Sequence, residues 1–139
     1  MPPISRTFIK TGLLYLVTAL VTGLVLAGSL PLGWPSWLAV LSPVYFHLFM
    51  VGWVTQLIIG VAYWMFPKFT KEQPRGSTTL AWAVYALLNS GLLVRMVAEP
   101  LQSLQPRPLW GWLLLLSASL QWLGGVIFVI NTWPRVKEK

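Results

Sequence analysis

Six polar side chains could do chemistry within the apolar segments of this chain: His47, Gln56, Asn89, Arg95, Glu99 and Gln121. Polar groups are costly inside a membrane and are usually functional there. Gln56, Asn89 and Gln121 carry no charge, and we interpret them as hydrogen-bonding groups between helices. His47 and Arg95 are the candidates for a functional site. A neutral imidazole can ligate a heme or a metal, relay a proton or form a buried hydrogen bond.

The composition excludes most soluble and catalytic classes. The chain has 139 residues, of which 56% are hydrophobic and 9% charged, and its formal net charge is +7. Soluble domains carry roughly 25% charged residues. The absence of cysteine excludes disulfide scaffolds, thiolate zinc sites, iron–sulfur clusters and thiol catalysis. Because Glu72, Glu99 and Glu138 are the only acidic residues, metal binding or acid–base catalysis by carboxylates is not expected. We therefore expect an integral membrane protein with a single domain, residues 1–139.

The hydropathy pattern predicts an all-α membrane bundle of four helices. Each apolar stretch is near the ~20 residues that cross a bilayer, and we place the spans at about residues 11–30, 43–66, 78–99 and 109–133. A proline follows each span: Pro31, Pro67, Pro100 and Pro134. Ser42-Pro43 is typical of a helix start, and Ser77 or Thr78 is the expected cap of the third span. The first span is long for a signal peptide and three more follow it, so we expect it to be retained.

The basic residues predict the orientation. One side of the membrane collects eight of them, namely Arg6, Lys10, Lys68, Lys71, Arg75, Arg135, Lys137 and Lys139. The other side has only Arg95 and Arg107. The positive-inside rule then places both termini in the cytoplasm of a bacterial or archaeal cell, with the chain in the inner membrane. Scattered basic residues at helix ends favour contact with anionic lipid over nucleic acid.

His47 and Arg95 are expected at the same depth. His47 lies four residues after Pro43, and Arg95 lies five residues before Pro100. At a rise of about 1.5 Å per residue, each is roughly 6–8 Å inside its helix end, in the outer leaflet. We therefore predict that the two residues form one site. Glu99, four residues beyond Arg95 on the same helix, could pair with it.

The sequence around His47 resembles a known family. Residues 45–53 (YFHLFMVGW) and 60–67 (GVAYWMFP) are similar to the catalytic subunit of the heme–copper oxidase and nitric oxide reductase superfamily. The resemblance is strong over about 25 of the 139 residues. It implies that His47 corresponds to the ligand of the low-spin heme. Tyr45 stands where the family's His-x-His pair has its first histidine, and the copper histidines have no counterpart.

The resemblance implies a b-type heme protein that transfers electrons. The family's catalytic subunit consists of three arcs of four helices, and this chain corresponds to one arc. The implied heme is held by His47 and shared with His47 of a second copy in a dimer or trimer. Arg95 or Arg107 would contact the propionates. Met50 lies one turn after His47 and cannot reach the opposite side of the heme, whereas Met96 could supply a sixth ligand. The candidate cofactor-binding set is His47, Arg95, Arg107, Tyr45, Met50 and Met96.

Other functions stay open on the sequence alone. No Cys-x-x-Cys-His motif is present, so covalent heme attachment is excluded. Without copper-site histidines, an electron-transfer protein with a respiratory redox partner is favoured over an enzyme. One alternative is a heme-free accessory or assembly subunit of a respiratory complex, in which His47 only hydrogen-bonds. The other is a gas sensor with five-coordinate heme iron.

Overall fold

The computed structural model describes residues 1–72 and 74–136, and within them it contains helices and no strand. The α-helices are α1 (Pro3–Gly28), α2 (Ser42–His47), α3 (Gln56–Met65), α4 (Thr78–Leu104) and α5 (Pro108–Thr132). Three shorter elements are the 3-10 helices η1 (Ser36–Leu41) and η3 (Trp133–Arg135) and the π-helix η2 (Leu48–Thr55). Because η1, α2, η2 and α3 follow one another directly, they form one rod, Ser36–Met65. The all-α prediction is confirmed.

Four helical rods are long and apolar enough to cross a membrane. They span Pro3–Gly28, Ser36–Met65, Thr78–Leu104 and Pro108–Arg135, with 26 to 30 residues each. Large apolar side chains lie on their outer surfaces. On α1, for example, Leu14 is 69% exposed and Leu24 is 71% exposed. Such surfaces suit a lipid environment. The structure is that of a multi-pass membrane protein.

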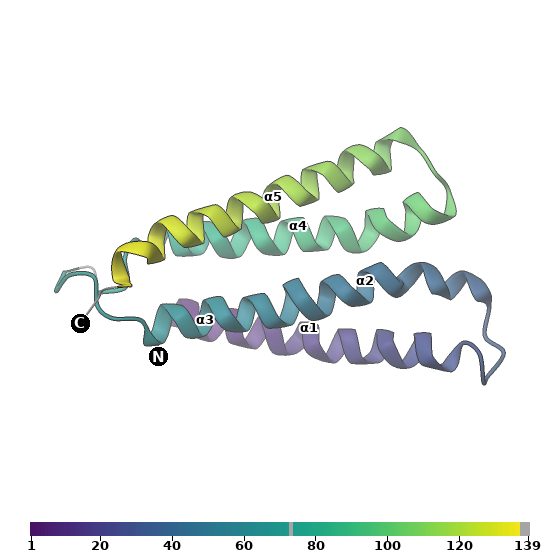
Figure 1. Cartoon of the computed structure of the whole chain (residues 1–139), viewed down its shortest axis with the longest axis horizontal. Coiled ribbons are helices and arrows are strands. Elements are labelled where there is room, and N and C mark those ends of the chain that lie inside the picture. The colour runs from purple at the N-terminus through teal and green to yellow at the C-terminus, as the bar shows by residue number, and fades with distance from the viewer. Residues whose placement is uncertain (73, 137–139) are drawn as a thin grey trace.

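The rods are arranged as two helical hairpins (Figure 1). α1 lies beside the rod 36–65, and α4 lies beside α5. The beginning of α1 and the end of α5 lie at the same end of the bundle, which we call the terminal end. The opposite end carries η1 and the turn at residues 105–107. Both termini at one end is what an even number of membrane spans requires. The prediction that this end faces the cytoplasm is not tested by the structure. Lys137, Glu138 and Lys139 lie outside the described residues.

Two buried apolar clusters hold the rods together. The cluster nearer the terminal end joins α1, α3 and α4, and consists of Ile4, Phe8, Ile59, Tyr63, Ala81, Val84 and Leu88. The cluster nearer the opposite end consists of Ala19, Val44 and Leu48, with Tyr15, Tyr45, Phe49 and Met96 packed against it. His47 lies in the chain between two members of this second cluster, Val44 and Leu48. The packing of those neighbours therefore fixes the helix face on which the His47 ring projects.

Three predicted helix boundaries are wrong. Pro100 lies inside α4, which continues to Leu104. Close to the C-terminal end of a helix, proline removes only one backbone hydrogen bond, and membrane helices tolerate this loss. Ser42 is not a cap, because the 3-10 turns of η1 already precede it. The Ser77 cap is confirmed, since its hydroxyl accepts a hydrogen bond from Leu80 N at 3.3 Å. α1 begins at Pro3, earlier than the predicted residue 11.

The rod that carries His47 changes its winding directly after that residue. In η2, the Thr55 hydroxyl donates to the carbonyl of Met50, five residues earlier, at 2.8 Å. Gly52 in this segment lies against α1 so closely that a Cβ atom there would be 2.8 Å from Tyr15. π-helical turns are rare and frequently mark functional sites. Here the wide turn follows immediately after the candidate ligand.

Candidate functional site

His47, Arg95 and Glu99 form one polar cluster between α2 and α4. Nη1 of Arg95 lies 3.3 Å from Nε2 of His47 and donates to Oε1 of Glu99 at 3.0 Å. The second carboxylate oxygen of Glu99 lies 3.3 Å from Nδ1 of His47. The predicted proximity of His47 and Arg95 and the predicted pairing of Arg95 with Glu99 are therefore confirmed. His47 and Arg95 lie further from the helix ends than predicted, because the rod 36–65 begins before Pro43 and α4 ends after Pro100.

The partners of the His47 ring define its tautomer. Nδ1 lies 2.8 Å from the carbonyl oxygen of Pro43, one turn earlier in the rod, and a carbonyl can only accept. Nε2 lies beside Arg95, whose guanidinium can only donate. Nδ1 therefore carries the proton and Nε2 carries the lone pair. The imidazole is neutral in this arrangement. Because the Nδ1 proton points at Pro43, Glu99 Oε2 lies nearby without accepting a hydrogen bond.

Ser117 on α5 fixes the other side of the Arg95 guanidinium. Nε of Arg95 donates to the Ser117 hydroxyl at 3.2 Å, and that hydroxyl donates to the carbonyl of Gly91 at 2.6 Å. Ser117 is fully buried. The close contact depends on Gly91, where a Cβ atom would be 2.9 Å from the Ser117 carbonyl oxygen. Ser117 is not among the residues predicted from the sequence. The only sequence signal for it is a pair of serines, Ser117 and Ser119, in the apolar stretch 113–120 (LLLLSASL), and serine is a common helix-packing residue in membranes.

The cluster is largely screened from its surroundings. The side chains of His47, Arg95 and Glu99 are 24%, 17% and 13% exposed. Arg95 and Glu99 compensate each other's charge, so the cluster with its neutral imidazole has no net charge. An unpaired charge at this place would be strongly unfavourable, since little water reaches it. The cluster therefore combines a compensated ion pair with a neutral imidazole nitrogen that can still act as a base.

The other candidate cofactor-binding residues lie outside this cluster. The ring of Tyr45 packs over Gly23 of α1. Met96 packs against the cluster of Ala19, Val44 and Leu48. Met50 is 41% exposed on the surface of η2, and Arg107 is exposed before α5. Within the part of the chain that the structure describes, His47 contacts only Arg95 among the other five candidates. The heme-binding roles of all six stay predictions.

A second polar network crosses the middle of the bundle. The side-chain amides of Gln56 on α3 and Asn89 on α4 bond to each other, with 2.9 Å from Gln56 Nε2 to Asn89 Oδ1. Asn89 also donates to the carbonyl of Tyr85, and the Tyr85 hydroxyl bonds to Thr11 of α1 at 2.8 Å. The interhelical role predicted for Gln56 and Asn89 is confirmed. Gln121 instead donates to Ser117 on its own helix, so the prediction for that residue is wrong.

The fold and the cluster define a helical multi-pass membrane protein with a partly buried site of imidazole, arginine and carboxylate side chains. Comparison with known proteins finds no matching family model, no similar curated protein and no similar solved structure. Among the described residues, no group of three or more His, Cys, Asp or Glu side chains could hold a metal ion.

Proposed function

We propose that this protein is a membrane b-type cytochrome whose heme iron is ligated by Nε2 of His47. The observation that carries the proposal is the tautomer of the imidazole. Histidine ligands of metals usually donate the other ring N–H to a carbonyl or carboxylate, which fixes the ring and raises its basicity. His47 has this arrangement, with Nδ1 on the Pro43 carbonyl, Glu99 alongside and the lone pair on Nε2.

The donor set fits a heme on condition that Arg95 moves. Nε2 has one lone pair, which Arg95 Nη1 approaches to 3.3 Å. Iron coordination would replace that contact. Arg95 would keep Glu99 and Ser117 as partners, because they bond to it at 3.0 and 3.2 Å through other acceptors. A guanidinium released from the ring is also suited to a carboxylate such as a heme propionate.

Homo-oligomerisation would complete the coordination of the iron. His47 is the only histidine of the chain, so a bis-histidine heme needs a second copy. The His47 side chain is 24% exposed, and apolar side chains next to it, including Phe46 at 59%, lie on the surface of the rod. This face supports a contact with another copy of the chain. A dimer or a trimer would satisfy the requirement.

A heme held by two histidines would supply one-electron redox chemistry and would leave no site on the iron for a substrate. This chain's own residues hold and tune the group. The Pro43 carbonyl holds the Nδ1 proton, the Glu99 carboxylate lies alongside, and Arg95 provides positive charge near the ring. The proposed role is electron transfer with a respiratory redox partner. We place the protein in a cell membrane with both termini in the cytoplasm, on the basis of its basic residues.

One observation favours a second candidate function, a heme-free accessory or assembly subunit of a respiratory complex. Both ring nitrogens of His47 have partners within the chain, Pro43 and Arg95. In that role the cluster would be structural, and it would join α2, α4 and α5 by hydrogen bonds. A membrane protein can use such contacts for helix association alone.

The visible absorption spectrum of the purified full-length protein, expressed with heme supply, separates these functions. We expect a six-coordinate low-spin spectrum that His47→Ala abolishes. The matched control is Met65→Leu, at the far end of the same rod and 68% exposed, which should leave the spectrum unchanged. A five-coordinate high-spin spectrum would indicate a gas sensor. A protein without a Soret band under these conditions would support the heme-free subunit and refute our proposal.

A further inference from the structure

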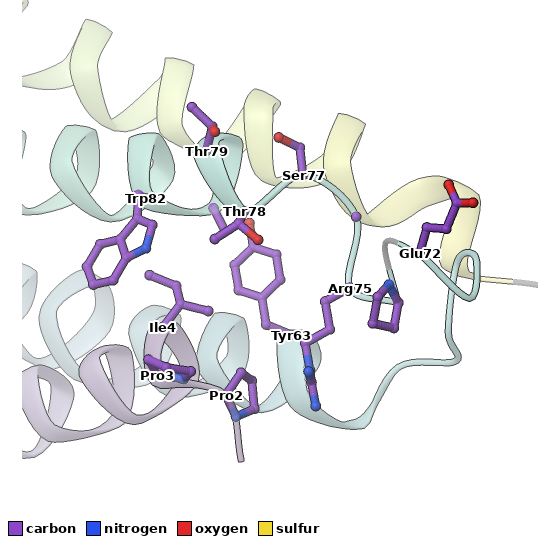
Figure 2. A pocket seen from close by; sticks show the side chains of 13 residues that line it. Pro2, Pro3, Ile4, Tyr63, Glu72, Arg75, Ser77, Thr78, Thr79 and Trp82 are labelled. Atoms are coloured by element: carbon purple, nitrogen blue, oxygen red, sulfur yellow. The ribbon is translucent and has the colours of Figure 1, made fainter.

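A cavity of about 470 Å³ lies at the terminal end of the bundle, far along the fold from His47. Figure 2 shows its lining, which comes from α1, α3, α4 and the segment before α4. Both hairpins contribute to it. The cavity plays no part in the heme proposal, so a function for it stands independently of that proposal.

Two long helices present their N-termini to this cavity. Pro2, Pro3 and Ile4 at the start of α1 and Ser77, Thr78 and Thr79 at the start of α4 all line it. The first backbone N–H groups of a helix have no partner within the helix, and the N-terminus carries about half a positive charge. Ser77 caps Leu80 N, and α1 has no side-chain cap. Because Pro2 and Pro3 carry no N–H, the donors that remain at the cavity are chiefly the N–H groups of Thr78 and Thr79 at the start of α4.

A buried hydroxyl in the same cavity, that of Tyr63, lacks a well-formed hydrogen bond. Tyr63 is 1% exposed and lines the cavity, and among the described residues its phenolic oxygen has no hydrogen bond of ordinary geometry, although the Asn131 side chain lies close enough to interact with it. The neighbouring amide of Asn131 is already committed, because it accepts from Ser77 N at 2.9 Å and donates to Ser77 O at 3.0 Å. Figure 2 shows the Tyr63 ring extending from α3 toward Thr78. A buried hydroxyl without a partner is unfavourable, and an acceptor in the cavity would satisfy it.

The charged side chains of the lining also favour an anion. Arg75 lies beside Pro2 and Tyr63 in Figure 2, while Glu72 lies at the edge of the lining with its carboxylate directed away from them. Arg75 donates no hydrogen bond to a carboxylate in the described part of the chain, and its backbone carbonyl accepts from Arg135. A guanidinium can form a bidentate contact, which phosphate groups accept well.

We propose that this cavity binds a phosphate group, carried by a lipid headgroup or free in solution. The N–H groups of Thr78 and Thr79, the Tyr63 hydroxyl and the Arg75 guanidinium supply the donors. Helix N-termini bind phosphate through exposed N–H groups and the helix dipole. The cavity lies at the end of the bundle where a membrane-spanning chain meets the headgroups, so a lipid could reach it.

The test measures saturable binding to the full chain in a neutral detergent, by the shift of the thermal unfolding midpoint. The two probes are inorganic phosphate and dihexanoyl phosphatidylglycerol, a soluble lipid with a phosphodiester headgroup. Arg75→Gln should weaken binding of the effective probe about tenfold, and Tyr63→Phe, which keeps the packed ring, about fivefold. The matched control is Lys71→Gln, an exposed cation of the same segment that does not line the cavity. It should change the affinity by less than about twofold.

The outcomes separate the two sources of phosphate. Saturation by inorganic phosphate supports a free phosphate ligand, and saturation by the lipid alone supports a headgroup site. Equal losses in Arg75→Gln and Lys71→Gln would mean diffuse attraction to a basic surface and would overturn the proposal. Saturation by neither probe would also overturn it. A heme spectrum that is present or absent in the same samples has no bearing on these results.

Discussion

The guanidinium of Arg95 on α4 reaches the imidazole of His47 on α2, with 3.3 Å between Nη1 and Nε2. This contact joins the two helical hairpins in the half of the bundle away from the termini. It also leaves the ring neutral, because arginine can only donate to Nε2. The same arginine is paired with Glu99 and held by Ser117. The contact therefore couples a candidate metal ligand to a compensated ion pair.

Replacing Glu99 by glutamine should destabilise the protein. Glu99→Gln keeps the size of the side chain but leaves the charge of Arg95, which is 17% exposed, without a counterion. Breaking a largely buried pair by removing one partner typically costs about 3 kcal/mol. Unfolding by sodium dodecyl sulfate in mixed micelles measures the change. The matched control is Glu72→Gln on an exposed segment, which should change the free energy of unfolding by less than about 0.5 kcal/mol. Equal effects at both positions would contradict the described ion pair.

Adding a methyl group at Gly52 should also destabilise the bundle. The new Cβ would lie 2.8 Å from Cβ and Cγ of Tyr15, and neither the π-helical segment nor α1 can move without disturbing the neighbouring packing. Overpacking of this kind costs about 1–3 kcal/mol. Gly125→Ala on α5 is the control, because no atom of a neighbouring element lies within 4 Å of the position that its new methyl group would take. It should be neutral or stabilising by up to about 1 kcal/mol, since alanine favours helix. The same unfolding assay distinguishes the two variants, and a stable Gly52→Ala protein would refute the close approach.

The Gln56 and Asn89 side chains should be energetically coupled. A double-mutant cycle with Gln56→Leu and Asn89→Leu isolates their interaction, for which we expect about 0.6 kcal/mol, the average for hydrogen bonds between membrane helices. Gln56 with Gln121 serves as the control pair, because Gln121 bonds to Ser117 on its own helix. Additive effects for Gln56 and Asn89 would show that their contact does not contribute to stability.

The segment 67–77 should face the cytoplasm. Lys68, Lys71 and Arg75 lie in it, and positive charge is retained on the cytoplasmic side during insertion. A reporter active only outside the cytoplasm, fused after Arg75, should be inactive, whereas the same reporter fused after Gln105 should be active. The reverse pattern would invert the predicted orientation.

Much of the fold can be predicted from local sequence patterns, namely hydropathy and helix caps, without knowing how the helices pack. Four apolar stretches of membrane-spanning length predict the four rods, and the Ser77 cap is visible as a serine before an apolar run. The equal depths of His47 and Arg95 predict their contact. Helix ends are less predictable. Pro43 and Pro100 are typical of helix boundaries, although the helical winding continues through both in the structure.

The residues of the site that the sequence does not predict depend on which helix faces pack against each other. Ser117 is part of the site only because Gly91 allows α4 and α5 to approach closely. The sequence predicts Arg135 as an ordinary cytoplasmic cation. In the structure it is 1% exposed and its guanidinium bonds to backbone carbonyls, including Phe66 at 2.8 Å and Pro67 at 3.1 Å. The sequence near Ser117 or Arg135 does not predict these contacts, because each joins segments that are far apart in the chain.

The most direct test of the central claim is to count chains and hemes together by native mass spectrometry of the protein in detergent. The proposal predicts oligomers in which each heme is shared by two copies of the chain, and no heme on a single copy, because each copy has a single histidine to offer. In His47→Ala the heme should be lost, and Met65→Leu should behave like the wild-type protein. A monomer carrying a low-spin heme would contradict the shared ligand, and heme retained in His47→Ala would contradict His47 as the ligand altogether.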